Sequence, residues 1–291
     1  MAQRKIMTNK KIGITSNVIV DRIGMDGYAL IKKAGFDTID FNMQRGFFSV
    51  KKNGFLCDMV NSIIRHKKEI ELCGLTISQT HAPYYTLEKY MQCDAELECY
   101  FDAVEQALWA TILLECKRFV IHPLHTYDWM KTSEFELTHK LIKRISNIAK
   151  NKGIYICMEN LPYDFCGNYI KHSFFLEMLK EYNVKGCFDT GHSKMCDKNV
   201  LEHLKYLRDK IYVVHIHDND GIKDLHSRIR PNSLEWQNIF SEIEINKNII
   251  SYSLETSGIY KICKVDDIYN ELVMDYESVC SYIDKNNIEG D

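Results

Sequence analysis

The stretch IYVVHIHDNDGIKDLHSR, residues 211–228, joins a strand-like apolar run to a dense group of ionisable side chains. Residues 213–228 alone hold three histidines and three aspartates. Side chains alternate across a strand, so if Val214 and Ile216 face outward, His215 and His217 face the other side. The pattern indicates chemistry at the end of a core strand rather than a solvated loop.

Similar short apolar runs alternate with amphipathic helical patterns along the whole chain. Helical patterns such as 93–115 and 133–153 place apolar residues three and four positions apart. We expect strands at residues 12–19, 36–41, 75–81, 118–123, 154–160, 184–190, 211–217 and 249–255. Strand–helix alternation predicts a parallel sheet, and eight repeats favour an α/β fold closed as a single (β/α)8 TIM barrel. No glycine-rich phosphate loop follows the first run, which counts against an open doubly wound sheet. We therefore expect a flexible N-terminal tail at 1–10 and one barrel domain over 11–291.

The composition narrows the class of protein. The chain has 291 residues, 45% hydrophobic and 26% charged, as in ordinary globular proteins. A net charge of −3 gives no general electrostatic reason to bind nucleic acid or an anionic membrane. Eleven scattered cysteines without a C-x-x-C pair, and no apolar signal segment, favour reduced thiols in the cytoplasm. No run approaches the roughly 18 apolar residues of a membrane span.

In a barrel of this kind, functional residues lie at the carboxyl ends of the strands. Six consecutive expected strands end in residue types that bind metal, and these residues are His81, His122, Glu159, Asp189 with His192, His215 with Asp224 and His226, and Glu255. Taken singly, each has a simpler structural role. Imidazoles and carboxylates buried together need a cation, and mixed N/O ligands suit Zn²⁺, Mn²⁺, Co²⁺ or Fe²⁺. The pattern therefore predicts a divalent metal site.

The motifs THAPYY, VIHP, MEN, FDTGH, HIHDNDG, the D-x-H at 224–226 and LET occur in an order and spacing that resemble the xylose isomerase-like barrels. The resemblance covers about residues 12–256. This superfamily contains sugar phosphate isomerase/epimerase-like proteins, keto-sugar 3-epimerases and endonuclease IV-like AP endonucleases. By resemblance to the epimerases, Glu159, Asp189, His215 and Glu255 form a single-metal quartet in which the two glutamates also exchange the substrate proton. By resemblance to the three-metal endonucleases, the further ligands are His81, His122, His192, Asp224 and His226. The metal count therefore stays open between one and three per chain, with Zn, Mn or Co as candidates.

The sequence departs from these relatives after the D-x-H motif. Many relatives continue with a Pro-Gly-Glu-Gly-like turn, whereas this chain reads SRIRPNSLEW, residues 227–236. The basic DNA-contacting loops of the endonucleases, including Asp-Arg-His-His, are absent. Aromatic rings can stack on sugars and arginine forks can bind anions. The candidate substrate-binding residues are His125, Tyr84, Lys194, Arg228, Arg230 and Trp236, with packing or solvated roles as the alternative.

Three functions follow from these residues. The first is a metal-dependent isomerase or epimerase of a sugar, sugar phosphate or polyol, with Glu159 and Glu255 as acid and base around a metal-stabilised enediolate. The alternative is a multi-metal phosphoesterase, whose substrate we expect to be a small phosphate ester and not DNA. The third is a barrel that keeps its metal for structure or sensing, which only the altered 227–233 loop supports. Assembly into a homo-oligomer stays open.

Overall fold

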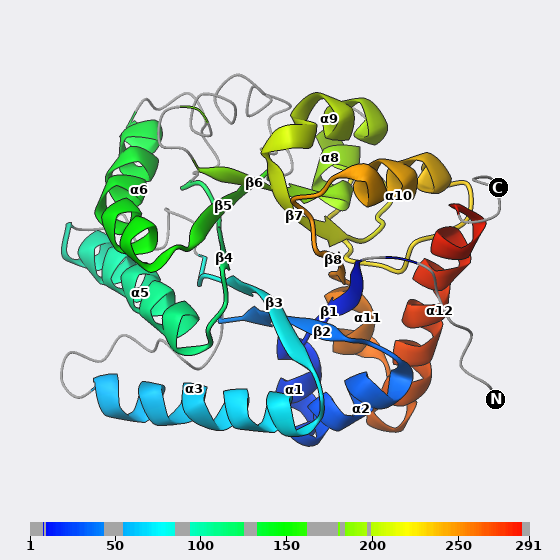
Figure 1. Cartoon of the computed structure of the whole chain (residues 1–291), viewed down its shortest axis with the longest axis horizontal. Coiled ribbons are helices and arrows are strands. Elements are labelled where there is room, and N and C mark those ends of the chain that lie inside the picture. Colours follow the sequence, from blue (N-terminus) through cyan, green and yellow to red (C-terminus); the bar gives the residue numbers. More distant parts are fainter. Residues whose placement is uncertain are drawn as a thin grey trace.

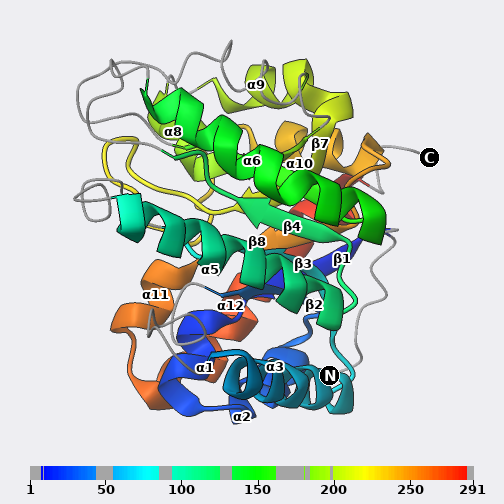
Figure 2. The same cartoon turned by 90° about the vertical axis from the view of Figure 1, so that its left-hand side faces the viewer.

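The computed structural model describes Thr8 and residues 10–43, 55–84, 94–124, 133–161, 180, 184–196 and 199–286. Eight parallel strands close into a barrel in sequence order, surrounded by helices (Figures 1 and 2). The strands are β1 (Lys11–Thr15), β2 (Thr38–Asn42), β3 (Thr76–His81), β4 (Arg118–Ile121), β5 (Tyr155–Glu159), β6 (Lys185–Asp189), β7 (Ile211–Ile216) and β8 (Ser251–Leu254). The expected (β/α)8 barrel is confirmed.

The described helices cover the outside of the barrel, and the helix over residues 268–286 packs against those over residues 26–34 and 236–245 (Figure 1). They are α1 (Asn17–Ile23), α2 (Asp26–Ala34), α3 (Phe55–Leu72), α5 (Asp94–Leu113), α6 (Ser133–Lys152), α8 (Thr190–Cys196), α9 (Val200–Leu207), α10 (Trp236–Ile245), α11 (Ser257–Ile262) and α12 (Ile268–Asn286), with short 3-10 turns at Arg208–Lys210 and Val265–Asp267. Among these described helices, none is both long and apolar enough to cross a membrane.

The first strand is shorter than its apolar pattern predicts. β1 ends at Thr15, and residues 17–23, which the run IGITSNVI partly covers, form α1. The Ser16 amide still donates to the Asp40 carbonyl of β2, but the Ser16 carbonyl already accepts from the Val20 amide. The predicted strand was too long because the apolar, β-branched pattern extends past the end of β1 into α1. Within α1, Ile19 is the buried residue.

The interior of the barrel is closed below the mouth by a small apolar cluster. It consists of Val120, Cys157, Cys187 and Val213. Each of these residues precedes a predicted metal ligand by two positions, so the two side chains point to the same side of their strand. The strand alternation therefore places an apolar layer beneath a polar one. The eight cysteines whose side chains the structure describes are free thiols.

The start of the barrel domain stays a prediction, because residues 1–7 and 9 lie outside the described part of the chain. Within the expected tail, Lys10 is buried and its ammonium donates to the carbonyls of Asn246 and Ile249, each at 2.7 Å. Thr8 donates to Glu244 at 2.9 Å. The end of the tail is therefore tied to the barrel at the segment between α10 and β8.

Candidate metal centre

The mouth of the barrel brings the predicted ligands together. In the described residues, side-chain nitrogens and oxygens form three groups that could each hold a metal ion, with the ligand atoms of each group within 4.8 Å of one another. Of the nine predicted ligands, only His122 falls outside these groups, and its Nε2 lies 3.2 Å from Glu159 Oε2. The proximity follows from topology, because a closed parallel barrel collects all strand ends at one rim.

The central group consists of Glu159, Asp189, His215 and Glu255. His215 Nδ1 lies 2.8 Å from Glu255 Oε2 and 3.4 Å from Glu159 Oε2. Asp189 Oδ2 lies 3.9 Å from the same nitrogen. Neither His215 Nδ1 nor Glu255 Oε2 makes a hydrogen bond of acceptable geometry to the described residues, although both atoms are buried. Three carboxylates facing one imidazole nitrogen are a donor set that fits a divalent cation.

A second group consists of His81, Glu159 and His215, and it shares Glu159 and His215 with the first. His81 Nε2 lies 3.1 Å from Glu159 Oε2, the same oxygen that His122 approaches. The His81 ring also stacks on the His215 ring, with centroids 5.7 Å apart. Glu159 could therefore contribute to either group of ligands.

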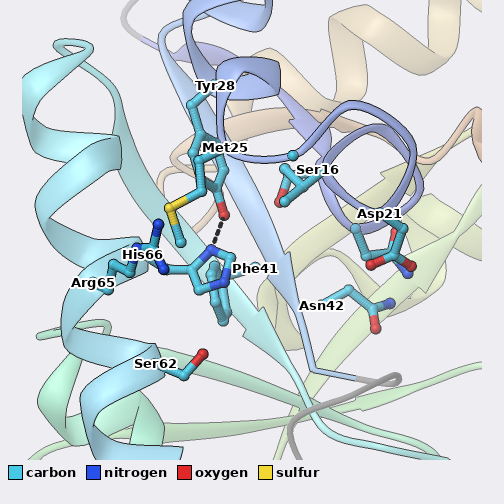
Figure 3. Close-up of a pocket in the computed structure, with 12 residues that line it drawn as sticks. Ser16, Asp21, Met25, Tyr28, Phe41, Asn42, Ser62, Arg65 and His66 are labelled. Atoms are coloured by element: carbon cyan, nitrogen blue, oxygen red, sulfur yellow. Dashed lines mark hydrogen bonds between the residues drawn. The ribbon is translucent and has the colours of Figure 1, made fainter. Parts of the chain in front are cut away.

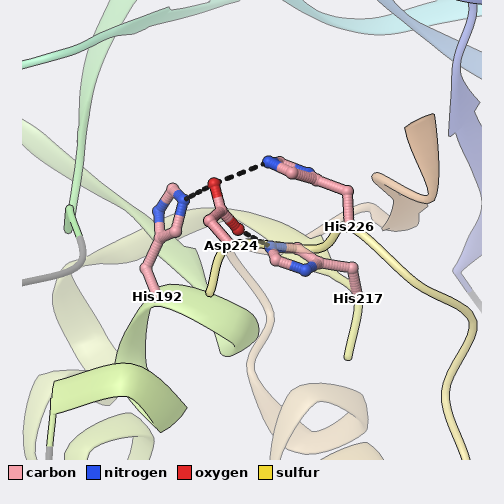
Figure 4. Close-up of side chains that lie close together, drawn as sticks. All are labelled: His192, His217, Asp224 and His226. Atoms are coloured by element: carbon pink, nitrogen blue, oxygen red, sulfur yellow. Dashed lines mark hydrogen bonds and ion pairs between the residues drawn. The ribbon is translucent and has the colours of Figure 1, made fainter. Parts of the chain in front are cut away.

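The third group consists of His192, His217, Asp224 and His226 (Figure 4). Asp224 Oδ2 lies 3.3 Å from His192 Nε2 and 2.8 Å from His226 Nε2. His192 comes from the first turn of α8, whereas Asp224 and His226 come from the loop after β7. His226 has a φ of +44°, a strained backbone held by a bond from the Gly258 amide to the His226 carbonyl. Strain of this kind is concentrated at functional sites.

The charges of these groups depend on one another. Burial alone would raise the pKa of Glu159, but the nearby His215 and His122 hold that pKa well below its usual value. Burial opposes the charged form of His226, yet Asp224 and Glu255 raise its pKa to about 9. Metal binding needs unprotonated ligand nitrogens, so a cation at the mouth would compete with protons for these imidazoles.

The three cationic residues that were predicted to bind substrate form ion pairs with carboxylates of the protein itself. Lys194 is buried and donates to Asp218 Oδ1 at 2.6 Å, and Arg230 donates to Asp218 Oδ2 at 2.9 Å. Arg228 donates to Asp275 at 2.6 Å and to Glu271 at 2.7 Å. These pairs fix the loop that carries Asp224 and His226, and a role of the three cations in substrate binding stays a prediction.

The ring-bearing residues that were predicted to bind substrate lie in different places. Tyr84 stacks on His122 at the mouth, with ring centroids 4.2 Å apart. Trp236 is buried at the start of α10, where its Nε1 donates to the Arg230 carbonyl and to Ser233 Oγ. Trp236 therefore packs the core beneath the loop. His125 lies outside the described residues.

Two residues at the mouth were not among the predicted ligands. His217 joins the third group, and its place on the same strand face as His215 is the sequence signal for it. Asp40, in the middle of β2, lies 3.3 Å from His215 Nε2 through its Oδ2. Its signal is weaker, since FDTIDF holds two aspartates and nothing in the pattern separates a ligand-supporting residue from a turn residue near the strand end.

A cavity of about 450 Å³ lies between α1, α2 and α3 beside the mouth (Figure 3). Its apolar walls include Met25, Tyr28 and Phe41, and the Tyr28 hydroxyl lies 2.9 Å from His66 Nδ1. Asn42 also lines the cavity and is the register partner of His81 on β3. The cavity therefore borders the strand ends that carry the candidate ligands.

Comparison with known proteins gives the family. A family model described as xylose isomerase-like TIM barrel matches residues 28–270, and the chain belongs to that family. The uncharacterized protein MJ1614 of Methanocaldococcus jannaschii is 30% identical over 162 residues, which span 54% of this chain and 62% of that relative. The chain thus covers less than two thirds of that relative, whereas it covers 90% of a second, 23% identical M. jannaschii protein, MJ1311.

Solved structures share the fold along almost the whole chain. A sugar phosphate isomerase/epimerase from Parabacteroides distasonis superposes with a TM-score of 0.69 at 17% identity, covering 97% of this chain and 98% of the other. An L-ribulose 3-epimerase superposes with a TM-score of 0.70 at 14% identity, again covering 97% and 98%. At these identities, the likeness shows the fold.

Proposed function

We propose that the protein is a metal-dependent isomerase or epimerase of a small carbohydrate. The observation that carries the proposal is the pair Glu159 and Glu255, which approach the same nitrogen of His215 from β5 and β8, three strands apart around the barrel. Substrate held at this point would have a carboxylate on each side. The similarity of the fold to sugar epimerases and isomerases supports the same assignment.

The donor set fits a divalent ion on Glu159, Asp189, His215 and Glu255, with Zn²⁺, Mn²⁺ or Co²⁺ as the candidates. Such an ion supplies positive charge that lowers the cost of the enediolate formed when a keto-sugar loses a proton. One glutamate takes the proton from the carbon beside the carbonyl, and the other, in its protonated form, gives its proton to the enediolate from its own side. Return to the opposite face of that carbon gives an epimer, and return to the neighbouring carbon, with the hydroxyl proton moving from one oxygen to the other, gives an isomer.

Proton exchange with solvent tests this function directly. The metal-loaded protein, incubated in D₂O with ketopentoses, ketohexoses and their phosphates, should produce an epimer or isomer that carries deuterium at the reacting carbon. Glu159→Gln and Glu255→Gln should each lower turnover by about 100-fold or more. Glu98→Gln, an exposed carboxylate on α5 that pairs with Arg144, is the matched control and should leave turnover unchanged. Failure of every sugar to exchange would contradict the proposal.

A multi-metal phosphoesterase is the second candidate, because the third group of ligands favours it. His192, His217, Asp224 and His226 could hold an ion beside the central group, and neighbouring ions can clamp both oxygens of a phosphoester displacement. Elemental analysis of protein purified without chelator separates the two functions. About one metal per chain favours enolisation, and two or three per chain with phosphate release from small esters favours hydrolysis.

A further inference from the structure

Asp40 is a buried carboxylate without an ordinary counter-charge. It lies on β2, is fully shielded from solvent, and faces the interior of the barrel. Its Oδ2 accepts from the Thr15 hydroxyl at 3.4 Å and lies 3.3 Å from His215 Nε2, a short ion-pair distance at which the ring is not turned into hydrogen-bond geometry. Its Oδ1 has no hydrogen-bond partner in the part of the chain that the structure describes. Burying a carboxylate with so few partners is costly, so its contact with His215 requires an explanation.

The contact crosses the barrel. β2 and β7 are separated by β1 and β8 in the closed sheet, so Asp40 and His215 meet through the interior and not as neighbours in the sheet. The two nitrogens of the His215 ring are therefore divided between two environments. Nδ1 faces Glu159 and Glu255, whereas Nε2 faces Asp40.

This arrangement of partners determines which tautomer of His215 can bind a metal. A histidine ligates through a nitrogen that carries no proton, and the hydrogen bond made by the other nitrogen selects the tautomer. For His215 to ligate through Nδ1, its proton has to sit on Nε2, where Asp40 can accept it. Asp40 itself belongs to none of the candidate metal groups among the described residues.

We propose that Asp40 is a positioning residue for the metal centre, which holds His215 with its proton on Nε2 and its Nδ1 lone pair directed at Glu159, Asp189 and Glu255. The proposal rests on the metal centre of the proposed function. It also accounts for the buried charge, because a cation on Nδ1 makes the Nε2–H a stronger donor to the carboxylate. Stacking of His81 on the His215 ring adds a second restraint on the orientation of the ring.

Metal binding to Asp40→Asn tests the proposal. An asparagine keeps the size of the side chain but can offer an N–H to Nε2, which favours the wrong tautomer. Metal-free protein is titrated with Co²⁺, with calorimetry for the Kd and the Co²⁺ d–d absorption for the ligand geometry. We expect Asp40→Asn to bind Co²⁺ about 10- to 100-fold more weakly, with an altered d–d band. The thermal midpoint of the metal-free variant should not fall, because a buried charge has been removed.

Gln79→Leu is the matched control. Gln79 is buried, is the register partner of Asp40 on β3, and its Nε2 has no hydrogen-bond partner among the described residues. The control should keep the wild-type Kd. Equal Co²⁺ affinity in wild type and Asp40→Asn would overturn the role of Asp40 and leave the metal centre standing. Failure of the wild type to bind Co²⁺ would overturn both.

A measurement on the wild type covers the case in which Asp40→Asn does not fold. In zinc-loaded protein with ¹⁵N-labelled histidine, one ring should show Nδ1 bound to metal and a downfield Nε2 proton hydrogen-bonded to a carboxylate. His215→Gln should remove this signal and so assign it. A His215 ring with its proton on Nδ1, or one without a downfield Nε2 proton, would overturn the proposal.

Discussion

Gly191 leaves room for the imidazole of His217. The motifs FDTGH and HIHDNDG therefore pack against each other through these two residues. A β-carbon at position 191 would overlap the His217 ring at Cε1. Beside it, Thr190 Oγ1 donates to the His217 carbonyl and accepts from the His217 amide. The ring then reaches Asp189 Oδ1 at 3.0 Å. The glycine is thus required by a side chain of the mouth.

Replacing this glycine should be costly. Gly191→Ala forces the buried ring or the backbone of α8 to move, and we expect the free energy of unfolding to fall by about 1–3 kcal/mol. Urea denaturation measures the change. Gly27→Ala, on α2, is the control, because the nearest atom to its new β-carbon is a methyl of Ile19 at 3.1 Å. Equal stability of the two variants would contradict the tight fit of His217 on Gly191.

The loop after β7 is the element on which the third group depends, and α12 holds it in place. Arg228 in this loop reaches Asp275 and Glu271 on α12. Asp275 is fully buried, and burial raises its pKa, while Arg228 favours its charged form. Tyr260 also donates to Asp275, at 2.6 Å. The last helix thus anchors the segment that presents Asp224 and His226.

Replacing Arg228 should therefore destabilise the loop after β7. Arg228→Met leaves Asp275 without its cation, and breaking a pair of this kind costs about 3 kcal/mol or more of unfolding free energy. Urea denaturation of the single variant and of Arg228→Met with Asp275→Asn gives the comparison. The double variant should recover part of the loss, because it removes the stranded charge. A single variant within about 0.5 kcal/mol of wild type would show that the pair behaves as a surface contact.

The elements also show what sequence can and cannot predict. The convergence of His81, Glu159 and Glu255 follows from strand order alone, because parallel strands in a barrel end at one rim. The pairing of Arg228 with Asp275 was not predictable, since the partner lies 47 positions away on α12 and nothing local marks it. The sequence therefore predicted an anion-binding role for Arg228 without revealing that its guanidinium pairs with Asp275.

For Asp40, the position in a strand was predictable from the sequence, but the contact with His215 was not. Its strand was predicted at 36–41, and its inward direction follows from alternation with Ile39 and Phe41. Its partner His215 stands on a strand three places away around the barrel, and only the diameter of the closed sheet brings the two together. Contacts across the barrel interior depend on the distance between opposite strands and on the length of the side chains. The pattern of residues along the sequence does not contain that distance.

At the scale of the whole molecule, the cysteines are a test of the closed interior. Burial raises the pKa of the Cys116 thiol to about 11 and that of Cys157 to about 12. Because the thiolate is the reactive form, both should resist iodoacetamide at pH 8 in the native protein and react after unfolding in urea. Mass spectrometry of the alkylated peptides locates the modified residues. Rapid native labelling of Cys157 would contradict the closed apolar layer below the mouth.

Metal removal should loosen the molecule as a whole, because the candidate ligands come from strands all around the barrel. A ligand present at 100 times its Kd stabilises the folded state by about 2.7 kcal/mol. For a chain of this size, that corresponds to a fall of about 4–5 °C in the thermal midpoint when a chelator is added. Calorimetry with and without chelator measures the shift, and Zn²⁺, Mn²⁺ or Co²⁺ added back should reverse it. Glu255→Gln, which weakens the central group, should respond less to chelator. A chelator-independent midpoint in protein that elemental analysis shows to be metal-loaded would mean that the ion does not hold these strand ends together.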